Sequence, residues 1–131
     1  MAHPKMFDDD DPVLAQVRAI ALALPGAQEK ISHGRPAFFT TRVHCYYGGS
    51  VRIEGEWQAH DQAVVLHLPP AETEALRQDP RCFVPAYLGP SGWIGVDLDQ
   101  RTDARELGEL IEESHRMVAP KRRVARLGGT G

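Results

Sequence analysis

Cysteine is scarce in this 131-residue sequence: Cys45 and Cys82 are its only two, and neither belongs to a CxxC pair. A small secreted domain held together by disulfides is therefore not indicated. Long hydrophobic runs are also missing, because the longest, at 19–25 and 63–66, fall far short of the roughly 20 residues that span a bilayer. The chain opens on an acidic segment and not on a signal sequence. We expect a cytoplasmic protein that does not enter the membrane.

A large excess of charge of either sign is absent as well. The net charge is −3 and the isoelectric point is about 6.0, which argues against a surface that coats nucleic acid or membrane. The charge is uneven, however, with an acidic block at 8–11 and a basic end. The basic cluster consists of Arg116, Lys121, Arg122, Arg123 and Arg126.

This basic cluster is the candidate DNA-binding site. Fewer than about six phosphate contacts would give weak, salt-dependent binding that ignores sequence. The alternative is that these cations complement the C-terminal end of a helix and solvate a tail.

Catalytic and metal-binding motifs are missing too. The six histidines show no HxxxH or HExxH spacing, and there is no GxGxxG or Walker-type loop. We expect no metal and no cofactor. His44 and Cys45 are neighbours on a predicted strand, so they point to opposite faces and cannot form a dyad. His67 could approach Cys45 if the strand register allowed, although an inward cysteine more often serves packing.

The length fits a single domain. Residues 1–10 are predicted to form a disordered, dispensable acidic leader, 11–127 one domain, and 128–131 a flexible tail. A first helix is expected to begin at Pro12 with Asp11 as its N-cap.

Alternating, β-branched and aromatic runs predict strands at 29–32, 37–41, 43–47, 51–54, 63–68 and 93–98. Helical periodicity predicts helices from 12 to about 24, at 71–78 and at 103–118. Thr102 is expected to cap the last helix, with Leu107, Leu110 and Ile111 on its buried face. The order α-β(n)-α-β-α predicts an α+β domain, with an antiparallel sheet and helices packed on one side.

One turn presents a candidate anion site. In His33-Gly34-Arg35-Pro36, the glycine permits a left-handed conformation and the proline keeps the preceding residue extended. Arg35 could then hold a phosphate or carboxylate with its guanidinium fork, or the turn could simply fix the entrance of a strand. Trp93 joins His33 and Arg35 as a candidate ligand contact if it is half exposed, and is a core anchor otherwise.

Five short elements, in order, carry a resemblance that spans about residues 13–124. They are Leu24-Pro25-Gly26-Ala27, His33-Gly34-Arg35-Pro36-Ala37-Phe38, Leu66-His67-Leu68-Pro69-Pro70, Gly92-Trp93 and Val118-Ala119-Pro120-Lys121-Arg122. With them the chain resembles the MmcQ/YjbR-like proteins. The resemblance implies a CyaY (frataxin)-like fold, also described as a double-wing motif, and a DNA-binding label that rests on fold analogy.

Iron binding of the frataxin type is not expected, because such sites use an acidic ridge on the first helix. Here the neighbouring acids all precede Pro12, and Arg18 lies within the predicted helix.

Three functional hypotheses follow. The first is a non-enzymatic binding module that contacts DNA through the basic cluster. The second is an adaptor for a protein partner, using an exposed sheet face around Tyr46, Trp57 and Trp93. The third is an enzyme that uses His33, Arg35 and Cys45. Binding that weakens steeply with salt would favour DNA over the adaptor.

Overall fold

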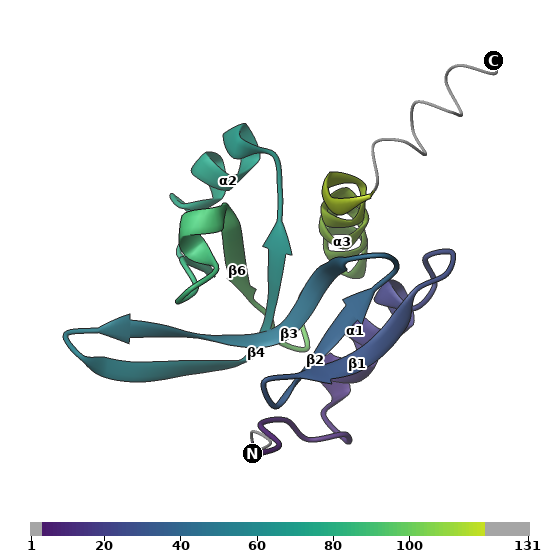
Figure 1. Ribbon diagram of the computed structural model, residues 1–131, viewed down its shortest axis with the longest axis horizontal. Coiled ribbons are helices and arrows are strands. Elements are labelled where there is room, and N and C mark those ends of the chain that lie inside the picture. The colour runs from purple at the N-terminus through teal and green to yellow at the C-terminus, as the bar shows by residue number, and fades with distance from the viewer. Residues whose placement is uncertain (1–3, 120–131) are drawn as a thin grey trace.

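An antiparallel sheet with helices packed on one face dominates the computed structural model, which describes residues 4–119 (Figure 1). The described residues form six strands in the order β1-β2-β3-β4-β6-β5. The strands are β1 (Gln28–Ser32), β2 (Arg35–Phe39), β3 (Val43–Ile53), β4 (Glu56–His67), β5 (Cys82–Phe83) and β6 (Trp93–Asp97). The helices are α1 (Pro12–Ala21), α2 (Pro70–Leu76) and α3 (Ala104–Val118), and a 3-10 turn covers Gly89–Ser91. The predicted α+β class is confirmed.

The strand register separates the two faces of the sheet. One row of paired residues is fully buried in the core with residues of α1 and α3: Phe38, Cys45, Leu66 and Ile94. Because side chains alternate along a strand, the adjacent row points to the opposite side. That row is Ala37, Tyr46, Val65 and Gly95. We call the side opposite α1 and α3 the open face.

Helix α1 begins as the sequence predicts. The Asp11 carboxylate accepts a hydrogen bond from the Val13 amide at 2.9 Å, and Pro12 occupies the first helical position. The helix ends earlier than expected, at Ala21.

Helix α3 corrects two expectations. Its N-cap is Asp103, whose carboxylate accepts from the Arg105 amide, whereas the Thr102 hydroxyl accepts from the Asp99 amide. Leu107 and Ile111 are fully buried. Leu110 is only partly buried at the edge of the apolar stripe, so the expectation that it is well buried is wrong.

The largest difference from the predicted strands concerns β3 and β4. The runs at 43–47 and 51–54 are one continuous strand, which passes through Gly48 and Gly49 with an irregularity in register. Since β6 pairs with β4 only from Ala63 onward, the far half of the β3–β4 hairpin projects beyond the body (Figure 1). None of the described helices is long and apolar enough to cross a membrane.

The described part of the expected leader contacts the domain. The Met6 amide donates to the Gly34 carbonyl at 2.8 Å, Phe7 packs against the core, and Asp9 pairs with Arg18 at 2.9 Å. An apolar side chain, a backbone hydrogen bond and an ion pair thus hold residues 6–9 against the domain, where the acidic composition suggested disorder.

Phe7→Ala is accordingly expected to lower the free energy of unfolding by about 1–2 kcal/mol, less than the loss of a fully buried phenylalanine. Thermal unfolding should show a drop of several degrees in Tm. Asp10→Asn, at an exposed position of the same segment, is the matched control and should leave Tm unchanged. If Phe7→Ala and the unmodified protein had the same Tm, the prediction that residues 1–10 are dispensable for folding would stand.

Candidate functional site

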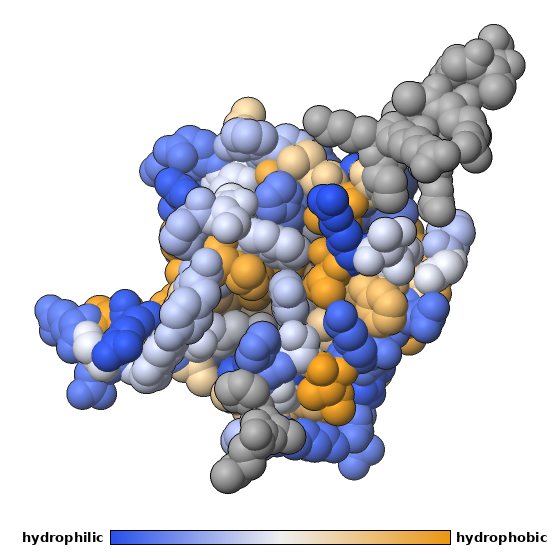
Figure 2. All heavy atoms as spheres, viewed as in Figure 1, coloured by the Kyte–Doolittle hydropathy of each residue, from blue (hydrophilic) through white to orange (hydrophobic). Residues whose placement is uncertain are grey.

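A cavity of about 580 Å³ lies on the open face, at the root of the projecting hairpin. Its wall is formed by the β1–β2 turn, β2, β3, β4 and the loop after β5. The principal lining residues are Arg35, Tyr46, Gly48, Trp57, Val65 and Tyr87. Figure 2 shows apolar patches among hydrophilic residues on the body beside the hairpin. A cavity of this volume is in the usual range for small-molecule sites.

Arg35 is the charged residue of this wall. It is only 8% exposed, and its Nη2 donates to Oδ1 of Asp61 at 3.2 Å. Its Nη1 is buried and has no hydrogen-bond partner among the described residues. A buried guanidinium with an unmet donor is costly, because lost hydration is not replaced. The single ion pair of Arg35 within residues 4–119 is with a carboxylate that is itself 69% exposed.

Gly48 makes room for this guanidinium. Its φ is +87°, and a Cβ placed there would lie 2.2 Å from Nη1 of Arg35. Any other residue would therefore both strain the backbone and displace the arginine. The buried position of Arg35 on β2 thus depends on a glycine of the next strand, β3.

The β1–β2 turn sets the direction of Arg35. His33 and Gly34 have φ values of 52° and 83° between the paired residues Ser32 and Arg35, as in a two-residue hairpin turn of type I′. His33 also lines the cavity. The structure therefore brings His33 and Arg35 together as the turn motif predicted.

Aromatic rings stand at the rim. Trp57 is 50% exposed and Tyr87 is 82% exposed, with ring centroids 5.9 Å apart. The Arg52 guanidinium lies 5.3 Å from the Trp57 ring centre. Tyr87 has a φ of 66°, which is an unusual conformation for a bulky side chain. The sequence pointed to Trp57 through the adaptor hypothesis but gave no signal for Tyr87.

Trp93 is not part of the cavity wall. Its ring instead meets Tyr46 edge-on at 5.5 Å and His67 at 5.3 Å. Because Tyr46 does line the cavity, Trp93 packs beside one residue of the wall, on the same face of the sheet. The structure therefore does not bring Trp93 to this cavity with His33 and Arg35; its ring contacts Tyr46 instead.

Burial disfavours the thiolate form of both cysteines, which is the nucleophilic form. Cys45 is fully buried on the core side, and burial raises the pKa of its thiol far above neutrality. Burial also raises the pKa of Cys82 to about 11. Since Cys45 pairs with Leu66, His67 points to the other face of the sheet. A Cys45–His67 pair and the combination of Arg35 with Cys45 are therefore both ruled out by the register.

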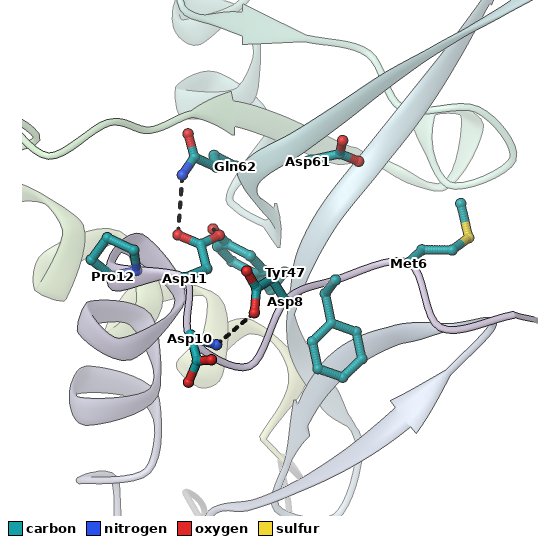
Figure 3. A pocket seen from close by; sticks show the side chains of 9 residues that line it. Met6, Asp8, Asp10, Asp11, Pro12, Tyr47, Asp61 and Gln62 are labelled. Carbon is teal, nitrogen blue, oxygen red and sulfur yellow. Dashed lines mark hydrogen bonds between the residues drawn. The ribbon is translucent and has the colours of Figure 1, made fainter.

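A second cavity, of about 510 Å³, is acidic (Figure 3). Its lining includes Asp8, Asp10, Asp11 and Asp61. Asp11 is occupied by hydrogen bonds from the Tyr47 hydroxyl and, at 3.0 Å, from Gln62. Burial opposes ionisation of Asp11, but these bonds and backbone amides leave its pKa below the ordinary value. Among residues 4–119, no three His, Cys, Asp or Glu side chains are placed to hold a metal ion.

The basic cluster lies mostly outside the described residues, which include only Arg116 of its five members. Arg116 pairs with Glu112 one helical turn earlier, at 2.9 Å. Nothing in the described part of the chain adds to the DNA-binding prediction.

Comparison with known proteins supports the fold and the family. No curated protein matches the chain. A crystal structure of a Pseudomonas syringae protein from the Northeast Structural Genomics Consortium is similar, with a TM-score of 0.60 and 16% identity, over 79% of this chain and 96% of that one. At this identity the likeness concerns the fold alone. The model of the YjbR family matches residues 22–117, most of the length. The chain therefore belongs to the YjbR family.

Proposed function

We propose that the protein is a non-enzymatic binding module whose ligand places an anionic group against Arg35 in the open-face cavity. The observation that carries the proposal is the buried guanidinium with an unmet donor, at the wall of an otherwise largely apolar cavity. A ligand oxygen would supply a charge-assisted hydrogen bond that the protein itself does not make there.

The geometry also indicates how such a ligand would be received. Nη1 is covered in this structure and faces Gly48, so a ligand oxygen would reach it only after the guanidinium turns. Asp61 holds the other side of the same guanidinium. The aspartate therefore competes with the ligand for Arg35 and weakens ligand binding.

The proposal includes the adaptor hypothesis in part, because Tyr46 and Trp57 of that hypothesis line the cavity. It differs in what decides recognition, which is a buried charge and not apolar contact alone. DNA binding through the basic cluster stays a prediction. A duplex backbone is too broad to bring its phosphates to a side chain that is 8% exposed, so the two proposals concern different surfaces.

Three anionic probes test the proposal in the intact protein: octanoate, 2-naphthoate and 2-naphthyl phosphate, each titrated by heteronuclear NMR. At least one should bind. Arg35→Gln should weaken that binding by at least about tenfold, the usual scale for one charged hydrogen bond. Asp61→Asn should strengthen it severalfold by removing the competitor.

Arg105→Gln is the matched control, since Arg105 is an exposed arginine of α3, and it should change nothing. The Asp61→Asn variant should remain folded, because the Asp61 side chain is 69% exposed. Its effect on affinity can therefore be read without a folding defect. If the Arg35–Asp61 pair were only structural, Asp61→Asn would lower stability without improving affinity. That result, or equal binding by Arg35→Gln, would overturn the proposal.

A further inference from the structure

We propose that the ligand is a monocarboxylate carried on a planar aromatic body. This inference rests on the proposed function and deepens it. Three features of the cavity lead to it: its charge, its aromatic wall and the unusual backbone of Tyr87.

The charge of the cavity favours a single negative charge on the ligand. Among the described residues that line it, Arg35 is the one Lys or Arg, and Asp61 already offsets part of that charge. A dianion, such as a phosphate monoester or a dicarboxylate, would bring a second charge into largely apolar surroundings and would have to reach Arg52, over the Trp57 ring at the rim, to pair it. A carboxylate, in contrast, matches one guanidinium in charge and in planar shape.

The wall beyond Arg35 favours a flat ring. Tyr46 and Trp57 line the cavity together with Arg35 and Val65, and Trp57 stands at its rim. Trp93 meets Tyr46 edge-on at 5.5 Å, which fixes this wall in place. Aromatic surfaces gain more from an offset or edge-on ring than from an aliphatic chain that covers the same area.

Tyr87 gives the most specific indication. It is 82% exposed although it is a large aromatic residue, and its φ of 66° is unfavourable for its side chain. The loop is held by hydrogen bonds from the Ala86 amide to the Ser50 carbonyl and from the Gly89 amide to the Pro85 carbonyl, both at 2.9 Å. These bonds keep Tyr87 at the rim beside Trp57. Strained backbone positions of this kind cluster at active sites and ligand clamps.

The same three probes, compared by dissociation constant, test this inference, with 2-naphthalenemethanol as the uncharged analogue. We expect 2-naphthoate to bind at least about fivefold more tightly than octanoate, the scale of one aromatic contact. It should also bind more tightly than 2-naphthyl phosphate, and at least about tenfold more tightly than the alcohol.

Tyr87→Asn distinguishes recognition of the aromatic ring from nonspecific apolar binding. Asparagine tolerates the left-handed backbone, so the loop is retained while the ring is lost. This variant should weaken 2-naphthoate severalfold and leave octanoate unchanged. Ile31→Ser, at an exposed apolar position on β1, is the control and should affect neither probe.

The outcomes distinguish this inference from the proposal beneath it. If octanoate or 2-naphthyl phosphate binds as tightly as 2-naphthoate, and Arg35→Gln still abolishes binding, the ligand class is wrong and the anion site stands. If Tyr87→Asn weakens both carboxylates equally, the aromatic specificity is likewise wrong. If no probe depends on Arg35, the proposed function itself fails.

Discussion

Ile111→Ala is expected to lower the free energy of unfolding by about 2–5 kcal/mol, as for other aliphatic side chains removed from a core. Ile111 is fully buried in the middle of α3, which contacts both α1 and the central strands. A cavity at this point would remove packing contacts of α3 with the helix α1 and with the strands β3 and β4. Urea denaturation at constant temperature measures the change.

Leu110→Ala provides the matched comparison. Leu110 precedes Ile111 in the same helix but is only partly buried, so its truncation should cost clearly less. A loss below half of the Ile111→Ala value would agree with the structure. Equal losses, or a loss for Ile111→Ala below about 0.5 kcal/mol, well short of a core truncation, would mean that the buried face of α3 is misassigned.

Acid should destabilise the protein through His44. This histidine is fully buried, its ring meets the His115 ring edge-on at 5.1 Å, and neither ring nitrogen has a hydrogen-bond partner among the described residues. Burial, aided by the nearby charge of His115, lowers the pKa of His44 from 6.5 to about 4. The neutral form is therefore the one that the fold accepts.

The pH range over which stability is lost follows from the pKa of His44 in the unfolded chain, 6.5, and in the folded chain, about 4. Above pH 6.5 the histidine is neutral in the folded and unfolded chains, and its full contribution to stability is present. As the pH falls from 6.5 towards 4, only the unfolded chain takes up the proton, so stability is lost. The loss levels off below pH 4, at about 3 kcal/mol in total from this residue.

His44→Phe removes this titration while retaining a ring of similar size. Urea denaturation at pH 7 and pH 5 should show that the unmodified protein loses about 2 kcal/mol more than the variant between the two values, from His44 alone. If both proteins lose stability in parallel, His44 is already hydrogen-bonded or accessible to water, and the buried neutral state is wrong.

Local signals in the sequence were sufficient for most of the fold. The Asp11-Pro12 cap, the alternation in β4 and the periodicity of α3 each depend on neighbouring residues, and each predicted its element. The failures arose where distant pairing overrides local preference. Gly48 and Gly49 suggested a break, but pairing with β4 carries β3 past them with only a shift in register.

The candidate site was predictable only in part, for a related reason. The His33-Gly34 turn could be recognised because two adjacent residues determine it, and it correctly pointed to Arg35. The partners of that arginine come from other strands: Asp61 lies 26 residues away along the chain. Their proximity depends on the register of β2, β3 and β4, which no local pattern specifies. Tyr87 carries no sequence signal because its significance lies in its backbone conformation.

The side-chain Nε–H resonance of Arg35 provides the most direct measurement of the central claim. In a nitrogen-15-labelled protein titrated with 2-naphthoate, this resonance should shift in a saturable way, together with the amides of Gly48 and Tyr87, and Arg105 should not respond. Asp61→Asn should bring saturation at a lower concentration of the probe. An unchanged Arg35 resonance, or shifts confined to residues 116–126, would contradict the account and return attention to the basic cluster.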